Sequence, residues 1–322
     1  MTIQIDKTIA GKTIREYLRE DLGYSVGMLK RLKFMEGGIT INGAFVTVRY
    51  VLQEGDLLQL STEDREEDTC PYMIPVDLPV PIVYEDAYLT AVDKPPAMPA
   101  HPSSGHRLDT VANALAFRYA DTPFVFRPVN RLDRDTSGLM LTSRSRLAAF
   151  KMYQHMTTGK IRKLYIAILC GTPKETAGKI RLPVCRVPGS VILRRVAAPG
   201  EAGAKDACTL YRVLSVGEKY TVVIAAPLTG RTHQLRVHFS AVGCPIAGDT
   251  MYGGEAADIG RHALHAVYLS FPHPQSGSLI SLYAPLPADM AALCPLSEAA
   301  LKEAVQTEAL RYFADVRTDD DT

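Results

Sequence analysis

The first sixty residues carry apolar positions at helical spacing, followed by short alternating runs that are typical of strands. The predicted elements are helices over 14–18 and 28–34 and strands over 39–41 and 57–60. Ser25 is well placed to cap the second helix, and Gly37-Gly38 ends it. Asn42-Gly43 predicts a tight hairpin turn, and Gly55-Asp56 predicts another turn before the last strand.

From about residue 75 onward, strands and helices follow one another without strict alternation. Strands are predicted at 82–84, 89–92, 139–143, 165–169, 209–214 and 221–225, and helices at 110–119, 144–157 and 231–242. Strict alternation would indicate a doubly wound parallel sheet. Its absence favours an α+β domain with a mixed, largely antiparallel sheet.

Composition divides the chain into four segments, and its 322 residues are enough for one large domain and one small domain. Residues 1–60 form the small α+β module. Residues 61–74 are polar, acidic and interrupted by a proline, which indicates a linker. Residues 75–290 form the large domain. Residues 291–322 are predicted to form a helix over 297–313 and an acidic tail.

Overall composition indicates a globular protein of the cytoplasm. Apolar residues make up 47% and charged residues 22% of the chain, and no apolar run is long enough to cross a membrane. The start, Met1 to Asp6, lacks the basic and apolar regions of a signal peptide. The six cysteines are scattered without a Cys-x-x-Cys pair, so we expect reduced cysteines and no zinc site.

Charge is balanced overall but unevenly distributed. The net charge is +1, yet twelve basic residues lie between Thr136 and Gly200 with Glu175 as the single acid among them. Such a concentration is typical of a site for a polyanion. The alternative is a solvated face whose acidic partners come from elsewhere in the chain.

The loop before the strand at 139–143 carries the most informative motif. Asn130-Arg131-Leu132-Asp133 is followed, after two residues, by Thr136-Ser137-Gly138 and an apolar run. Charged loops at the edge of a core are typical places for chemistry. The motif resembles the signature of the RluA-type RNA pseudouridine synthases, His-Arg-Leu-Asp, two variable residues, then Thr-Ser-Gly. Asn130 stands where the family has His.

Three further segments resemble the same family in the same order, over roughly residues 78–288. They are Lys94-Pro95 with His101-Pro102, then Lys163 to Ala167, and then Gly230 to His238 followed by Gly248-Asp249 and Tyr252. The resemblance implies a pseudouridine synthase fold and an enzyme that needs no cofactor and no metal. It implies ribosomal or transfer RNA as the partner, without naming the uridine. Protein partners and oligomeric state stay open.

The family's catalytic residues map onto Asp133, Arg236 and Tyr165. Pseudouridine formation breaks a carbon–nitrogen glycosidic bond, and the base then rotates and rejoins the sugar through carbon five. Asp133 would act as the ionised carboxylate, either attacking the anomeric carbon or taking a neighbouring sugar proton. Arg236 would keep it ionised, and Tyr165 would stack on the base and assist proton removal from carbon five.

The resemblance also implies a set of RNA contacts. These residues are Asn130, Arg131, Arg134, Lys94, His101, Lys163, Arg231 and His233. Arg131 is expected to fill the stack that a flipped uridine vacates, because a planar guanidinium suits stacking. Residues 1–60 resemble the alpha-L motif, a small RNA-binding module first described in a ribosomal protein.

Other function classes compete with this interpretation. Asp133 and Asp135 could form the carboxylate pair of a glycosidase, but such pairs usually come from separate elements across a cleft. His233 and His238 lack the i, i+4 spacing of a helical metal site. The chain could also be a non-catalytic RNA-binding protein, which the presence of Asp133, Tyr165 and Arg236 argues against.

A second copy of the motif letters occurs upstream, at His106-Arg107-Leu108-Asp109. It has all four residues of the family's His-Arg-Leu-Asp, whereas residues 130–133 have three of them. It is not followed by Thr-Ser-Gly and an apolar strand. A helical run comes directly after it, so Asp109 is predicted to be an N-cap rather than the catalytic carboxylate.

Overall fold

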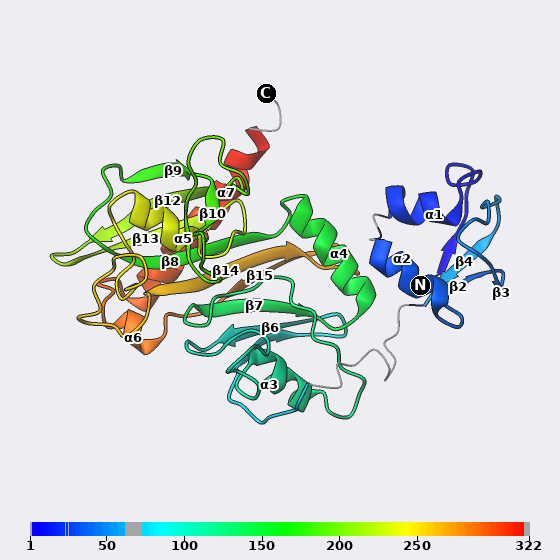
Figure 1. Cartoon of the computed structure of the whole chain (residues 1–322), viewed down its shortest axis with the longest axis horizontal. Helices are drawn as coiled ribbons and strands as arrows, with labels where there is room; N and C mark the ends of the chain where they lie inside the picture. Colours follow the sequence, from blue (N-terminus) through cyan, green and yellow to red (C-terminus); the bar gives the residue numbers. More distant parts are fainter. Residues whose placement is uncertain (1, 23, 25, 62–72, 319–322) are drawn as a thin grey trace.

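The computed structural model describes residues 2–22, 24, 26–61 and 73–318 (Figure 1). In the N-terminal module the elements are β1 (Thr2–Gln4), α1 (Ile14–Glu16), a π-helical turn (Tyr17–Asp21), α2 (Val26–Phe34), β2 (Ile39–Ile41), β3 (Ala44–Phe45) and β4 (Leu57–Leu60). The strands form a sheet in the order β1-β4-β2-β3. Strand β1 was not predicted, because three residues at a sheet edge carry little pattern.

The predicted hairpin between β2 and β3 is confirmed. Asn42 and Gly43 have φ angles of 51° and 82°, the pair of positive values that a two-residue hairpin turn requires. The first predicted helix continues as a π-helical turn after Glu16. Ser25, the predicted cap of α2, and most of the predicted linker lie outside the described residues.

Among residues 73–318, the large domain is built on a nine-stranded sheet. Its strand order is β5-β6-β7-β14-β8-β13-β12-β9, with β15 paired to β14. Only β7 and β14 run parallel among these pairings. The strands are β5 (Ile82–Glu85), β6 (Leu89–Lys94), β7 (Ser137–Ser143), β8 (Arg162–Cys170), β9 (Ala177–Arg181), β12 (Cys208–Val216), β13 (Tyr220–Pro227), β14 (Leu264–Pro272) and β15 (Leu279–Tyr283). The predicted α+β class with a mixed, largely antiparallel sheet is confirmed.

Helices cover this sheet, and a small hairpin flanks it. The helices are α3 (Val111–Arg118), α4 (Arg146–Thr157), α5 (Gln234–Ala241), α6 (Ala288–Ala291) and α7 (Glu298–Thr318), and the hairpin is β10 (Val184–Arg186) with β11 (Arg194–Val196). Leu115 of α3, Phe239 of α5 and Val305 of α7 belong to one hydrophobic cluster with the buried faces of β8 and β13. The helix after residue 290 therefore packs into the core of the large domain.

The N-terminal module contacts the large domain at α4, beside which it lies in Figure 1. Phe150 of α4 is buried in the module's hydrophobic cluster, with its ring centroid 4.6 Å from that of Tyr24. Nε2 of Gln154 donates to the carbonyl of Leu22 at 3.0 Å. The sequence did not predict this contact. The spacing of apolar residues in α4 does not indicate that Phe150 packs against the N-terminal module rather than against the large domain.

The N-terminus of α3 corrects one prediction. The helix is capped by Thr110, whose hydroxyl accepts the N–H of Asn113, and not by Asp109. Asp109 instead pairs with His106, Oδ2 to Nδ1, at 2.6 Å. A threonine directly after the aspartate can cap equally well, and helix boundaries shift by a residue in any pattern-based prediction.

Within the described residues, no helix has both the length and the apolar character that a membrane crossing requires.

Candidate active site

The loop before β7 displays Asp133 beside the core. Leu132 is buried in the main hydrophobic cluster, while the flanking Arg131 is exposed. The side chain of Asp133 is 28% exposed. The N–H of Thr136 donates to the carbonyl of Asp133 at 3.1 Å and closes a turn. The buried leucine thus fixes the loop, and the carboxylate lies where solvent or a substrate can reach it.

The Thr-Ser part of the motif ties this loop to His265 at the start of β14 and to His262 just before it. The hydroxyl of Thr136 lies 2.7 Å from Nε2 of His262, and the hydroxyl of Ser137 lies 2.9 Å from Nδ1 of His265. Burial lowers the pKa of His262 to about 3 and that of His265 to about 4. Both rings are therefore neutral near pH 7 and act as fixed hydrogen-bonding supports.

The glycine of the motif is required by close packing. Gly138 has a φ of +106°, and a Cβ there would lie 2.4 Å from the carbonyl oxygen of Ala266 in β14. Arg261 also fixes this loop, because its Nη1 donates to the carbonyl of Asp135 at 2.9 Å.

The sequence predicted no strand at β14. Nearly every residue of β14 is buried, so the alternation that marks a half-exposed strand is absent.

Arg236 of α5 faces Asp133, with Nη1 to Oδ2 at 3.4 Å. Its stronger partner is Asp249, which accepts from Nε and Nη2, both at 2.7 Å. The Tyr252 ring lies beneath the guanidinium, 4.9 Å from its central carbon. Burial acts to lower the pKa of Arg236, but the hydrogen bonds and charge of Asp249 outweigh it and raise the pKa. Asp249 is thus a site residue to which the sequence pattern assigned no role.

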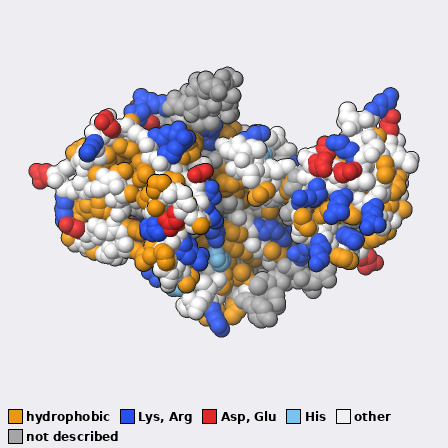
Figure 2. Space-filling view, turned by 45° about the horizontal axis from the view of Figure 1, so that its top comes forward, with side chains coloured by type: hydrophobic (Ala, Val, Ile, Leu, Met, Phe, Trp, Pro, Cys, Tyr) orange, Lys and Arg blue, Asp and Glu red, His pale blue; other side chains and the backbone are white. Residues whose placement is uncertain are grey.

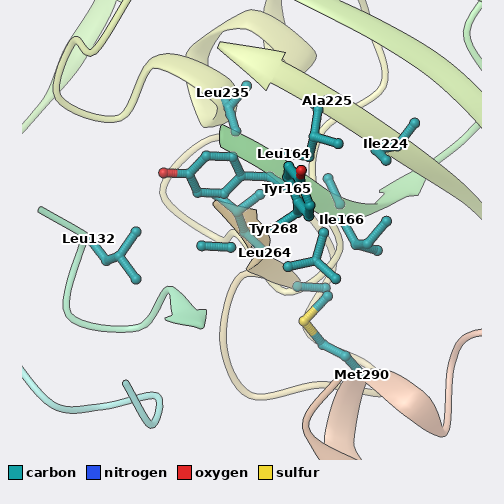
Figure 3. Packing of buried hydrophobic residues seen from close by; sticks show 14 of the residues in the cluster. Leu132, Leu164, Tyr165, Ile166, Ile224, Ala225, Leu235, Leu264, Tyr268 and Met290 are labelled. Atoms are coloured by element: carbon teal, nitrogen blue, oxygen red, sulfur yellow. The ribbon is translucent and has the colours of Figure 1, made fainter. Parts of the chain in front are cut away.

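Tyr165 of β8 lies in the same cluster as Leu132. Figure 3 shows it among Leu132, Leu164, Ile166 and Leu235. Burial raises its pKa, and the charge of Asp133 raises it further. Tyr165 therefore keeps its phenolic proton at neutral pH, close enough to Asp133 to respond to its charge. The three predicted catalytic residues come from the loop before β7, from β8 and from α5, and the fold brings them together.

Comparison with known proteins identifies this arrangement. The sequence profile described as RNA pseudouridylate synthase matches residues 88–241, which include Asp133, Tyr165 and Arg236. The uncharacterized RNA pseudouridine synthase YjbO of Bacillus subtilis is 38% identical over 283 residues, covering 87% of this chain and 98% of its own. The chain belongs to the RNA pseudouridine synthase family. It is an isomerase that acts on RNA.

Two further relatives support the RluA-type resemblance and the predicted pseudouridine synthase fold. Ribosomal large subunit pseudouridine synthase D of Vibrio cholerae is 35% identical over 279 residues, covering 81% of this chain and 84% of its own. The solved structure of Human RNA Pseudouridylate Synthase Domain Containing 1 covers 70% of this chain and 94% of its own, with a TM-score of 0.56 and 28% identity.

In this pseudouridine synthase, the residues predicted to contact RNA fall into three groups, which are exposed, half-buried and buried. His101, Arg131, Arg134 and Arg231 are exposed. Arg134 holds the carboxylate of Asp135 with Nε and Nη2 at 3.0 and 3.1 Å. Asp135 is therefore already paired, which further disfavours the alternative of a glycosidase carboxylate pair with Asp133. Lys163 and His233 are half-buried, and burial lowers the pKa of each.

Asn130 and Lys94 correct the predicted set of RNA contacts, because both are buried. Asn130 accepts from the N–H of Leu141 at 2.8 Å and donates to the carbonyl of Leu139 at 3.1 Å, so its amide supports β7. Nζ of Lys94 donates at 2.8 Å to the carbonyls of Pro95, Met98 and Arg134. Lys94 therefore joins two loops at the site, and burial lowers its pKa to about 7.

The basic residues between 136 and 200 do not form one continuous free surface. Arg146 is buried, Arg144 lies 3.5 Å from Glu85, and Arg195 pairs with Glu201 at 2.6 Å. The alternative of acidic partners from elsewhere in the chain thus holds for part of the segment. In the described part of the chain, no group of three His, Cys, Asp or Glu side chains could hold a metal ion.

Proposed function

We propose that this enzyme isomerises specific uridines of ribosomal RNA in the cytoplasm, with Asp133 as the catalytic carboxylate. The observation that carries the proposal is the position of Asp133, 3.4 Å from the buried guanidinium of Arg236, on a loop whose Leu132 shares the hydrophobic cluster of the buried Tyr165. The relative from Vibrio cholerae is named for the ribosomal large subunit, which favours ribosomal over transfer RNA.

Asp133 suits either route to the broken glycosidic bond. As a nucleophile it would attack the anomeric carbon, and as a base it would take the neighbouring sugar proton. Both routes need the ionised carboxylate. Arg236 supplies a fixed positive charge, and Asp249 holds that charge in place with two short hydrogen bonds. A cation that is already oriented needs no reorganisation when the reaction begins.

Tyr165 suits the base rather than the sugar. Because its pKa is raised, it carries a neutral hydroxyl and offers an aromatic face rather than a phenolate. We infer that it stacks against the uracil ring and that its hydroxyl assists removal of the proton from carbon five by passing on its own proton as it accepts that one. The exposed Arg131, adjacent to the catalytic loop's buried leucine, would fill the stack that the flipped uridine leaves.

RNA binding would combine the site's exposed cations with the N-terminal module. Lys30, Arg31 and Lys33 of α2 and Arg15 and Arg19 near α1 are exposed. Figure 2 shows Lys and Arg side chains gathered on this module. Clustered cations of this kind supply affinity through phosphate contacts, without sequence specificity.

The charge reversals Lys30→Glu and Lys33→Glu together should weaken RNA binding, reduce its salt dependence and leave turnover at saturating RNA unchanged.

Mapping of pseudouridine in total RNA, from cells with and without the gene, tests the proposal and identifies the substrate. We expect at least one ribosomal RNA position to lose its pseudouridine and to regain it when the gene is restored. Loss confined to transfer RNA would overturn the proposed substrate.

Activity should also survive chelation of divalent metals when monovalent salt maintains the RNA fold. A specific requirement for zinc would contradict the metal-free mechanism.

A further inference from the structure

His233 occupies a strained position beside the catalytic loop. It has φ 57° and ψ 18°, the left-handed region, which few residues other than glycine adopt. It stands at the N-cap position of α5, yet its side chain makes no capping hydrogen bond. The ring instead lies between Asp133 and Tyr252, and only 9% of the side chain is exposed. Strained residues of this kind cluster at functional sites.

The neighbours of His233 determine which ring nitrogen carries the proton. The backbone N–H of Arg194, in β11, donates to the hydroxyl oxygen of Tyr252 at 3.0 Å. The one hydroxyl proton of Tyr252 is then available for Nδ1 of His233, which lies 2.8 Å away. With Nδ1 as acceptor, the neutral ring carries its proton on Nε2. Nε2 faces Oδ2 of Asp133 at 3.7 Å.

The same surroundings keep the ring uncharged near neutral pH. Burial lowers the pKa of His233 below its usual value, and the opposing effect of Asp133 does not restore it. Arg236 therefore supplies the positive charge next to the carboxylate, and His233 supplies an oriented N–H. Both approach Oδ2, which leaves Oδ1 for the reacting sugar. The distance of 3.7 Å is longer than a hydrogen bond, as is common before substrate binds.

We propose that His233 is a positioning residue that orients the carboxylate of Asp133 through Nε2–H, and that Tyr252 acts through His233 by fixing its tautomer. The inference rests on the proposed role of Asp133. It replaces the sequence-based expectation that His233 contacts RNA. Two contacts, one from Arg236 of α5 and one from His233 at its N-cap position, would then hold one carboxylate oxygen.

His233→Gly is the variant that isolates the ring. Glycine adopts the left-handed region without strain, so the start of α5 should keep its conformation and only the side chain is lost. We expect the single-turnover rate at saturating enzyme to fall about 10²-fold, the effect of a misplaced reacting group. RNA affinity and the thermal midpoint should change little. Added imidazole should restore part of the rate, because it can occupy the vacated space.

Tyr252→Phe provides an independent measurement and a test of the order of action. It removes the hydroxyl but keeps the ring that stacks on Arg236. We expect a rate loss of about 10-fold, because the reacting group is again misplaced, though less severely. The double variant should be no slower than His233→Gly alone, because residues that act in series are not additive. Tyr220→Phe, which removes a hydroxyl bonded to the distant Asp258, is the matched control and should keep the full rate.

Each result separates the inference from the proposed function. A wild-type protein that forms no pseudouridine overturns the function itself. An active wild type with a fully active His233→Gly variant overturns the positioning role. A His233→Gly variant whose loss lies entirely in RNA affinity restores the RNA-contact interpretation and overturns the inference. If the rate losses of the two single variants add up in the double variant, the claim that Tyr252 acts through His233 is overturned.

Discussion

Two loops of this chain carry the letters Arg-Leu-Asp, and the structure places them in opposite environments. In the upstream loop Leu108 is 50% exposed, and in the loop that carries Asp133 Leu132 is 7% exposed. The side chain of Asp109 is 51% exposed and pairs with the nearby His106. Asp133 faces Arg236 and His233, which come from a helix about a hundred residues later in the chain.

The difference lies in the segment that comes after each aspartate. After Asp109 the chain enters α3, which is capped by Thr110 and whose first turn is tied to the carbonyls of Pro99 and Ile74. After Asp133 it enters β7 through Thr136 and Ser137, each bonded to a buried histidine near β14. Distant side chains therefore anchor the loop of Asp133, whereas His106, Arg107 and Asp109 of the upstream loop are bonded to residues within six positions. The three shared residues therefore indicate a function only together with the residues that fix their position in the fold.

The largest stability effect should come from Asp249, the acid that holds the buried Arg236. Asp249→Asn removes one partner of a buried ion pair, and such a change costs about 3–5 kcal/mol because the remaining charge stays buried. Asp109→Asn, at the exposed pair of the upstream loop, should cost less than about 1 kcal/mol. Urea unfolding of both variants measures the difference. Equal losses of unfolding free energy in the two variants would refute the contrast between the buried pair and the exposed pair.

The two leucines provide the next test. Leu132→Ala deletes a buried side chain of the main cluster and should lower the free energy of unfolding by about 2–5 kcal/mol. Leu108→Ala changes an exposed side chain and should stay within about 0.5 kcal/mol of the parent protein. Chemical denaturation followed by circular dichroism gives both values. A Leu108→Ala variant that loses as much stability as Leu132→Ala would contradict the described burial.

Alanine substitutions at two glycines distinguish the cost of backbone strain from the cost of close packing. Gly105, before the upstream loop, and Gly138 both have positive φ, but only at Gly138 would a Cβ meet backbone atoms. Gly138→Ala should therefore be about 1–3 kcal/mol more destabilising than Gly105→Ala, the range for strain at a special position. Thermal unfolding of the two variants measures this. A smaller loss at Gly138 would show that β14 can move away from the loop.

The smallest effect concerns the cap of α3. Thr110→Ala should cost about 1 kcal/mol, the usual value for loss of an N-cap hydroxyl. Asp109→Ala should cost less, about 0.5 kcal/mol or below, because it removes only an exposed pair. Parallel urea titrations rank the two variants. The reverse order would restore Asp109 as the helix cap.

Much of this organisation was predictable from local pattern. The turn at Asn42-Gly43 needs only two residues that tolerate positive φ, and the central helices of the large domain show their apolar spacing directly. The motif around Asp133 was recognisable because its loop residues are adjacent in sequence. Such features depend on neighbours a few positions apart, which one sequence displays.

The features that escaped prediction depend on distant contacts. Lys94 is charged, and only the fold shows that three carbonyls surround its ammonium group. Asp249 comes thirteen residues after Arg236 with no periodic relation, so their ion pair leaves no signal in spacing. His233 was assigned to RNA, whereas the left-handed start of α5 directs it to Asp133. Burial and pairing across the sheet decide these roles.

The central claim is that Asp133, not Asp109, is the catalytic carboxylate. The most direct measurement is single-turnover formation of pseudouridine, on the RNA found by mapping, with the wild type, Asp133→Asn and Asp109→Asn. We predict that Asp133→Asn abolishes product and binds the RNA within several-fold of the wild type, since phosphate contacts dominate affinity. Asp109→Asn should keep the wild-type rate. Appreciable product from folded Asp133→Asn, or loss of product from folded Asp109→Asn, would contradict the claim.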